Sequence, residues 1–332
     1  MFLAYLRITM KKTQKYIVSA VVPVYNGESF IGETIKSLLG QTRKFDEIVV
    51  ADDGSTDRTV EIVKKFKQVR LVQSNHVERI AIRNIGWKAA KGNIIAFIDS
   101  DLVLVPEWLE EILKGFDKGY AAAVDRRAVH HPQTYIAKLN DHFFDIRYGD
   151  NYKPFTLWVI RRDLLEQLGG LDEQVIAFED IDIADRVFES GHDVFFAAKA
   201  IAYHKGEPVS IREEIRRNFW FGSHVWPYWK KRIIGRRFVL SQDFLTSFRK
   251  PFRCTLFFVM TLLLLVKPIV LILFTLFCYL YVIVRDIKRG MKMNYIFVHA
   301  YIAVISEYTY AYGALYGLFF GPITFARKRA AV

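Results

Sequence analysis

The chain has 332 residues and a net charge of +12, and 52% of its residues are hydrophobic and 15% aromatic. This length allows one or two domains with a sizeable core. The charge is unevenly placed, with +8 over residues 205–253, +6 over 254–332 and −2 over 1–204. A nucleic-acid-binding protein usually carries its basic patch on the folded domain, so this distribution argues against nucleic acid as a partner.

Residues 16–125 alternate strand-like and helix-like segments, which predicts a parallel sheet covered by helices on both faces. Strands are expected at 16–22, 45–51, 69–73 and 94–98, and helices at 28–39, 57–66 and 78–90. Residues 126–204 are less regular, with helices expected at 161–168 and 179–190. The fold class is therefore α/β.

The remainder of the chain is basic, aromatic and apolar. Residues 211–237 interleave aromatic side chains with cations, which favours interfacial helices at a membrane, although a helix packed on the domain is the alternative. Residues 255–284 are apolar except at Lys267-Pro268, which predicts a tilted span or a re-entrant hairpin. Residues 295–321 are a second apolar stretch. Placing its ionisable side chains, His299 and Glu307, inside a membrane would be costly in free energy. The flanking cations would attract anionic lipid headgroups.

The cysteines and the N-terminus bear on location. Cys254 and Cys278 lie in or beside apolar runs and form no disulfide framework or zinc pattern, which fits a reducing, cytoplasmic catalytic domain. Residues 1–15 are interpreted as an N-terminal extension, too short in its apolar run for a span or a signal peptide. We expect an integral protein of the cell membrane, with two or three spans or a re-entrant hairpin and its catalytic domain facing the cytoplasm.

Two carboxylates follow the apolar strand at 94–98, in the sequence Asp99-Ser100-Asp101. Ligands of open α/β sheets bind beyond the carboxyl ends of such strands. Two neighbouring carboxylates repel each other unless a positive charge lies between them. A hard divalent cation that holds a substrate diphosphate meets this need. The alternative is an ordinary pair of loop aspartates.

Four further motifs stand at the ends of expected elements or within them. They are Val22-Pro23-Val24-Tyr25-Asn26, Ala51-Asp52-Asp53-Gly54-Ser55-Thr56-Asp57, Arg83-Asn84-Ile85-Gly86 and Phe178-Glu179-Asp180. Together with Asp99-Ser100-Asp101, they closely resemble the family 2 glycosyltransferases of the A-type, Rossmann-like nucleotide-sugar-binding fold. The resemblance covers about residues 17–204, and the order and spacing of five motifs make it specific.

The resemblance implies a site for a nucleotide-sugar donor, UDP- or GDP-linked. Tyr25 would flank the nucleobase, and Asp52 or Asp53 would accept hydrogen bonds from the base or the ribose. Arg83 offers a planar fork of donors for a base or a diphosphate, and its alternative is an exposed helix arginine. The full set of implied donor-site residues is Pro23, Tyr25, Asn26, Glu28, Asp52, Asp53, Arg83, Asp99 and Ser100.

The resemblance also implies a metal site and a catalytic base. Asp99, Asp101 and His204 would hold Mg²⁺ or Mn²⁺, with Asp101 the preferred direct ligand. Asp180, beside Glu179, would take the proton from an acceptor hydroxyl, which then displaces the diphosphate with inversion. The alternative for this pair is stabilisation of a helix N-terminus. Contacts to a diphosphate or a lipid are implied for Arg216, Arg217 and Trp220, which an interfacial helix explains equally.

The domains expected are an extension at 1–15, a catalytic domain at 16–208, interfacial helices at 209–253 and membrane helices with a basic tail at 254–332. The expected acceptor is a lipid-linked saccharide or glycolipid, used in making a cell-surface polysaccharide, and membrane lipids are expected partners. No Gln-x-x-Arg-Trp motif follows His204, which argues against a processive synthase.

Three alternative functions are weighed against this interpretation. A polyprenyl-phosphate glycosyltransferase would use an acceptor that is already an anion and needs no base. A dinucleotide or ATP site is rejected, because the nearest phosphate-loop match has Glu33 where a lysine belongs. A transporter or membrane scaffold would need a degenerate nucleotide domain, which the intact acidic motifs oppose.

Overall fold

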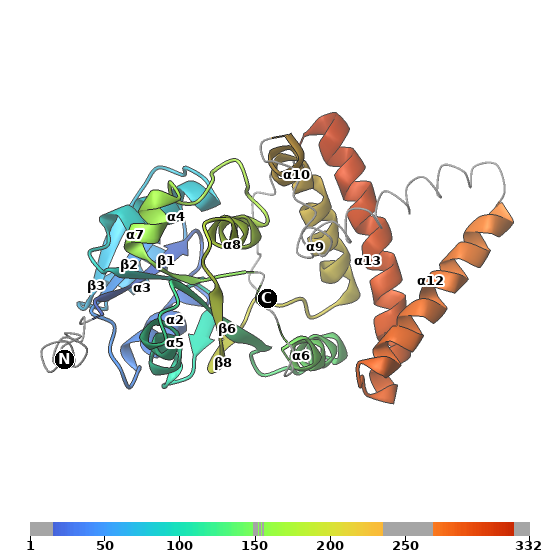
Figure 1. The fold of residues 1–332 in the computed structure, drawn as a ribbon, viewed down its shortest axis with the longest axis horizontal. Helices are drawn as coiled ribbons and strands as arrows, with labels where there is room; N and C mark the ends of the chain where they lie inside the picture. Colours follow the sequence, from blue (N-terminus) through green and yellow to red (C-terminus); the bar gives the residue numbers. More distant parts are fainter. Residues whose placement is uncertain (1–15, 149–151, 153, 155, 235–267, 322–332) are drawn as a thin grey trace, which may run out of the picture.

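The computed structural model describes residues 16–148, 152, 154, 156–234 and 268–321. A layered α/β part carries the first strands and helices, and a group of long helices lies against one side of it (Figure 1). The strands and helices of the first part lie between residues 18 and 204. The helical group is formed by the segments that follow residue 210.

The central sheet has eight strands in the order β3-β2-β1-β4-β7-β6-β8-β5. The strands are β1 (Val18–Val24), β2 (Glu47–Asp52), β3 (Val69–Gln73), β4 (Ile94–Phe97), β5 (Leu102–Leu104), β6 (Ala122–Val129), β7 (Val159–Arg161) and β8 (Val194–His204). The first four are parallel neighbours, as the alternation of elements predicts. All seven side chains of β1 are buried, which explains why it shows no polar alternation.

The sheet as a whole is mixed, since it also contains antiparallel strands that the sequence does not predict. β7 runs antiparallel to both β4 and β6, and β5 runs antiparallel to β8. β5 and β7 have three residues each, too few to show any periodicity in the sequence. The β5–β8 pairing matters for the site, because it sets Leu102 opposite His204.

Helices cover both faces of the sheet. The helices are α2 (Ile31–Leu39), α3 (Thr59–Lys64), α4 (Arg79–Ala89), α5 (Trp108–Asp117), α6 (Tyr135–Arg147), α7 (Arg162–Gln167) and α8 (Glu179–Glu189). One buried cluster joins α2, α3 and α5 to the sheet, and another joins α4, α7 and α8 to the opposite face. Burying each large apolar side chain stabilises the domain by about 1.5–3 kcal/mol.

The described residues of the C-terminal part form the helices α9 (Ile211–Ser223), α10 (Val225–Ile234), α12 (Pro268–Lys288) and α13 (Met293–Phe320). Among the described residues, no helix combines the length and the apolar character that crossing a membrane requires. The predicted membrane spans are therefore not confirmed. Part of the first predicted span, residues 255–267, lies outside the described residues.

α9 and α13 touch backbone to backbone. A Cβ atom added to Gly222 would lie 2.1 Å from the carbonyl oxygen of Tyr310, and one added to Gly313 would lie 2.2 Å from that of Phe219. One added to Gly317 would lie 2.2 Å from the carbonyl oxygen of Ser223. Such closeness requires glycine at all three positions. The helix pair is thus a specific packing unit.

α12 and α13 form a hairpin whose polar groups face each other. His299 Nδ1 lies 2.6 Å from Asp286 Oδ2, and Arg285 also contacts Asp286. Thr275 and Tyr308 hydroxyls are 2.8 Å apart across the same interface. The ionic partner of His299 therefore lies on the preceding helix, α12.

Candidate active site

Three of the motifs meet at one edge of the sheet. β1 ends at Val24 and β2 at Asp52, which are register partners, and the Asp53 amide donates to the Val24 carbonyl over 2.8 Å. β4 lies on the other side of β1 and leads into the Asp99 motif. Because carboxyl ends of neighbouring parallel strands share an edge, sequence-distant motifs come together.

The structure distinguishes between Asp52 and Asp53. Asp53 is engaged on both oxygens, by the Val77 amide at 2.6 Å and by His76 Nδ1 at 3.1 Å. Asp52 is fully buried, and its Oδ2 accepts from the Ser55 amide at 3.2 Å. Its Oδ1 has no hydrogen-bond partner among the described residues. A buried acceptor without a donor is costly, so Asp52 is suited to a ligand N–H or O–H group.

The Tyr25 ring lies 4.5 Å from the ring of His76, which precedes α4. Gly54 lies between their loops with a φ of +75°, and a Cβ there would sit 3.2 Å from the His76 amide nitrogen. The left-handed turn is what Gly54 permits. Tyr25 and His76 thus form an aromatic pair beside Asp53.

The other implied donor-site residues mainly hold loops. Asn26 Oδ1 accepts from the Thr56 amide at 2.8 Å, and Glu28 Oε2 accepts from the Arg58 amide at 3.1 Å. Pro23 is buried inside β1, and the Ser100 carbonyl accepts from Thr34 at 2.8 Å. These four residues shape the edge of the sheet.

Arg83 connects two acidic motifs. Its guanidinium donates to Asp99 through Nη2 and to Glu179 through Nη1, and Arg83 is only 2% exposed. Arg79, one turn earlier on α4, donates to Glu179 over 2.7 Å. Burial alone would raise the pKa of Asp99, but the charge of Arg83 holds that pKa well below its usual range. Asp99 is therefore held as an anion.

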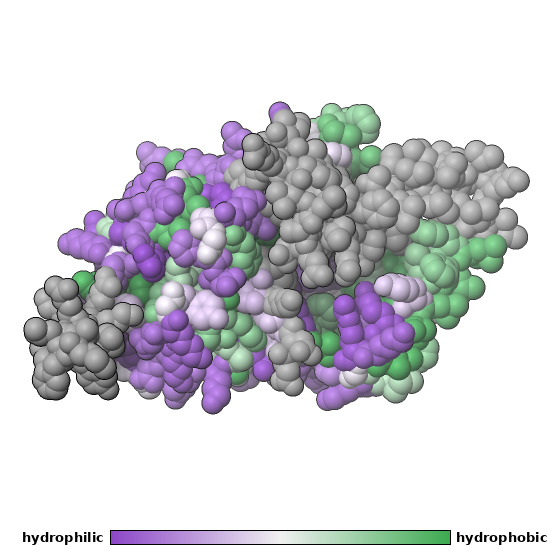
Figure 2. Space-filling model, viewed as in Figure 1, coloured by the Kyte–Doolittle hydropathy of each residue, from purple (hydrophilic) through white to green (hydrophobic). Residues whose placement is uncertain are grey.

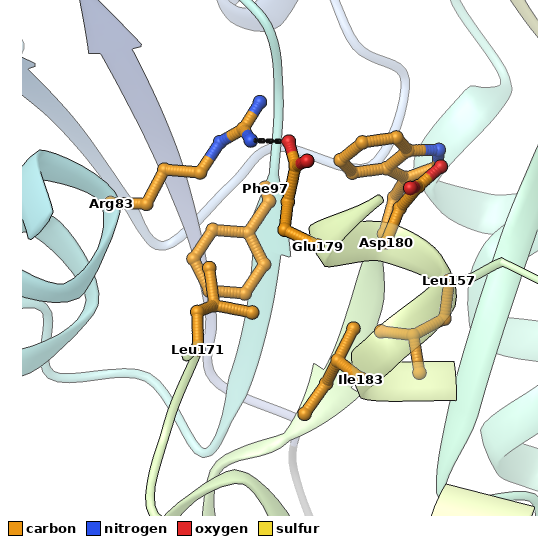
Figure 3. Close-up of a pocket in the computed structure, with 8 residues that line it drawn as sticks. Arg83, Phe97, Leu157, Leu171, Glu179, Asp180 and Ile183 are labelled. Carbon is orange, nitrogen blue, oxygen red and sulfur yellow. Dashed lines mark hydrogen bonds and ion pairs between the residues drawn. The ribbon is translucent and has the colours of Figure 1, made fainter. Parts of the chain in front are cut away.

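Asp180 has a different environment from Glu179. It lies at the start of α8, with its Oδ1 accepting from the Ile181 amide at 3.0 Å. Figure 3 shows Arg83 reaching Glu179, with Asp180 on the far side of that pair. Burial, and then the charge of Glu179, raises the pKa of Asp180 to about 6. A carboxylate with this pKa can accept a proton near neutral pH. A small pocket is lined by Arg83, Phe97, Leu157, Trp158, Leu171, Glu179, Asp180 and Ile183.

The guanidinium groups of two arginines lie over the ring of Trp158. The guanidinium carbons of Arg83 and Arg127 lie 5.5 and 5.0 Å from its ring centroid. Arg127 is anchored by Asp125, which accepts from it at 2.9 Å and from Trp108 at 3.1 Å. This arrangement adds positive charge close to the Asp99 carboxylate.

Asp101 and His204 lie together, although about a hundred residues separate them. The β5–β8 register brings His204 Nε2 to 3.4 Å from the Asp101 carboxylate. His204 Nδ1 faces Glu207 at 3.3 Å, and Arg217 pairs with Glu207 and with Glu214. The carboxylates of Glu207 and Glu214 outweigh the effect of burial and raise the pKa of Arg217.

Within the described ranges, no three His, Cys, Asp or Glu side chains are grouped to hold a metal ion. In this structure Asp99 pairs with Arg83 while Asp101 and His204 lie beside each other, and the expected metal trio stays a prediction. The remaining two still fit Mg²⁺ or Mn²⁺. A metal-bound histidine typically directs its other ring nitrogen to a carboxylate, as Glu207 provides. Mg²⁺ commonly uses few protein ligands and completes its shell with water and phosphate.

The residues of α9 occupy three different positions. Arg217 is one ion pair away from His204, through Glu207. Arg216 is exposed, and Trp220 packs against His224 with ring centroids 4.4 Å apart. Arg217 thus reaches the site through Glu207, whereas the Trp220 ring lies against Phe221 and His224.

The sequence analysis missed several residues of this site. Arg79 was detectable, because it precedes Arg83 by four positions and so shares its helix face. His76 lay in a loop whose pattern carries no signal. Arg127 and Trp158 fall on β6 and beside β7, in the region where the elements were least regular.

Comparisons with known proteins bear on the family and the fold of the chain. The model of the family described as glycosyl transferase family 2 matches residues 19–169. An uncharacterized glycosyltransferase of Haemophilus influenzae is 37% identical over 235 residues, covering 66% of this chain and 90% of that protein. The glycosyltransferase AglE of Haloferax volcanii is 28% identical over 242 residues, covering 68% of this chain and 78% of that protein. The chain spans only 14–22% of three longer curated relatives that it matches.

A solved structure shares the fold over nearly the whole chain. It is the mannosyltransferase PcManGT from Pyrobaculum calidifontis in complex with GDP-Man and Mn²⁺. The two have a TM-score of 0.65 and 19% sequence identity, and the match covers 96% of this chain and 94% of that one. At this identity the likeness concerns the fold.

Proposed function

Since the chain belongs to glycosyl transferase family 2 and is a glycosyltransferase, we propose that it moves a sugar from a nucleotide-diphosphate donor to an acceptor hydroxyl with inversion. The observation that carries this proposal is the contrast between two adjacent carboxylates. Glu179 is neutralised by Arg79 and Arg83, whereas the pKa of Asp180 is raised to about 6. Asp180 is therefore the group suited to act as general base.

The donor half of the site would bind the nucleotide through a buried carboxylate oxygen and an aromatic pair. The buried Oδ1 of Asp52 would accept from the base or the ribose, and Tyr25 with His76 would flank the base. A divalent ion held by Asp101 and His204 would neutralise charge on the diphosphate. The mannosyltransferase of similar fold, which holds GDP-Man and Mn²⁺, supports a nucleotide-sugar donor and a divalent ion for this chain.

The acceptor half follows from Asp180. An acceptor phosphate would already be ionised and would gain nothing from a base, so a titrating Asp180 favours a hydroxyl. We place this hydroxyl on a lipid-linked saccharide or glycolipid at a membrane, with the catalytic domain on the cytoplasmic side. The apolar C-terminal helices beside the site support this placement.

The test is a turnover assay with purified protein, a panel of UDP- and GDP-sugars, and lipid-linked saccharide acceptors, with Mn²⁺ or with a chelator. We expect one donor to yield a product of inverted anomeric configuration, and the chelator to reduce its formation. A product with retained configuration would exclude single displacement with Asp180 as base. Efficient transfer to a polyprenyl phosphate, and none to a hydroxyl, would favour the polyprenyl-phosphate enzyme instead.

A further inference from the structure

The outer face of the α12–α13 hairpin is unusually apolar for a surface. In the described part of the chain, twenty large hydrophobic side chains are exposed, and sixteen of them lie on these two helices. Figure 2 shows this concentration as a green surface over α12 and α13, while the sheet domain is mostly hydrophilic. Soluble monomers rarely expose an apolar patch of more than about 300–600 Å².

We name the α12 part of this surface the apolar face, and it forms one continuous stripe. Its members are each at least half exposed and recur at helical spacing: Ile272, Leu273, Leu276, Phe277, Leu280, Tyr281, Val284 and Ile287. The inner side of the same hairpin holds the Asp286–His299 ion pair and the Thr275–Tyr308 contact. The hairpin therefore has polar contacts between its two helices and a row of exposed apolar side chains on its outer face.

Cations lie directly beside the apolar face. Lys288, Arg289 and Lys292 are exposed at the turn between α12 and α13. The aspartate of the hairpin, Asp286, is buried and paired with Arg285 and His299. Apolar side chains next to the exposed Lys288 and Lys292 match the chemistry of a bilayer with anionic headgroups.

The contacts of α13 limit how lipid can meet the hairpin. Its Gly313 and Gly317 lie against the backbone of α9, and its Tyr295 and His299 stack on rings of α6. α9 carries exposed charges, among them Arg212 and Arg216, which need water or headgroups. Lipid can therefore contact the hairpin from one side.

We infer that the apolar face and the cations at its turn bind the surface of an anionic lipid bilayer, with the hairpin lying along the membrane. This arrangement would hold the catalytic domain beside membrane-bound acceptors. It goes beyond the proposed function, and it can be tested without any activity.

The test is flotation of the full chain with vesicles of phosphatidylcholine alone or mixed with phosphatidylglycerol. Wild-type protein should float with the mixed vesicles, less with phosphatidylcholine, and less again as salt is raised. The double variant Leu273→Glu, Phe277→Glu should bind at least about tenfold more weakly, because binding scales with buried apolar area. Lys288→Glu with Lys292→Glu should abolish the preference for phosphatidylglycerol.

The matched control is Ile17→Glu with Val209→Glu, which makes the same chemical change at two exposed apolar positions outside the hairpin. This variant should float like wild type, and circular dichroism should show all variants folded. Equal flotation of wild type and the Leu273/Phe277 variant would overturn the inference. So would a wild-type dimer that ignores vesicles and that this variant turns into a monomer, since the face would then bind a second copy.

Discussion

The ring of Phe178 lies 5.6 Å from the ring of Tyr228, so a C-terminal helix packs on the residue that precedes the Glu179–Asp180 pair. The centroid of the Phe221 ring lies 5.7 Å from the centroid of the Phe178 ring. Phe178 has a φ of 90°, a conformation that costs a non-glycine residue about 1–3 kcal/mol. The helices α9 and α10 thus hold a strained residue at the start of α8.

This relationship predicts a role for Tyr228 in activity. The Tyr228 hydroxyl donates to Asp185 of α8 over 3.0 Å, and Tyr228→Phe removes this bond. We expect kcat to fall by about fivefold, the effect of roughly 1 kcal/mol, with the donor KM unchanged. Tyr135→Phe, which loses a hydroxyl contact between α6 and the α13 turn, is the control. Equal losses in both variants, or a changed donor KM, would contradict a positioning role.

The Arg83 bridge predicts a large loss of stability on a conservative change. Lysine cannot donate to Asp99 and Glu179 at once, so Arg83→Lys leaves a buried charge poorly paired. The free energy of unfolding should fall by about 3–5 kcal/mol in chemical denaturation. Arg161→Lys, at the exposed pair with Asp163, should change it by less than about 1 kcal/mol. A similar small effect at both positions would show that the bridge is dispensable.

The raised pKa of Asp180 predicts how stability depends on pH. The pKa changes from 3.8 to about 6 on folding, so the native state binds the proton more tightly than the unfolded chain. As the pH rises through 6, Asp180 ionises in the native state and the free energy of unfolding falls. The fall is on the order of 2–3 kcal/mol when ionisation is complete. Asp180→Asn should accordingly melt at a higher temperature than wild type at pH 8, and the difference should shrink at pH 4. A difference independent of pH would contradict the assigned pKa.

The glycine contacts between α9 and α13 predict a further stability change. Gly317→Ala places a Cβ 2.2 Å from the Ser223 carbonyl, so the helices must separate. We expect the free energy of unfolding to fall by about 1–3 kcal/mol. Gly32→Ala in α2 is the control, because its Cβ would meet only Ile62 at 3.5 Å. There the helix propensity of alanine should leave stability unchanged or raise it by up to about 1 kcal/mol.

Much of the sheet was predictable, because local patterns determine it. The parallel strands β1 to β4 and their helices follow from apolar runs that end at glycine or aspartate. The strands β5 and β7 were not predictable, since three residues carry no period and their pairing partners lie far away in the sequence. The domain from α9 onward was predicted as helical, but its glycine packing depends on which helices meet.

The site was predictable as a set of residues and only partly as a set of contacts. Asp99 and Asp101 look equivalent in the sequence, yet one pairs with Arg83 and the other faces His204. Which carboxylate a guanidinium reaches depends on tertiary structure. For the same reason Glu179 and Asp180, adjacent in the chain, have different partners, since Glu179 pairs with Arg79 and Arg83 while Asp180 accepts from the Ile181 amide.

The most direct test of the account compares Asp180→Asn with wild type in two measurements on the same preparation. Transfer to the acceptor hydroxyl should fall by about a hundredfold to ten-thousandfold, the usual contribution of a general base. Thermal stabilisation by the nucleotide-sugar donor should stay as in wild type, because Asp180 acts on the acceptor. Transfer at nearly the wild-type rate would contradict the account.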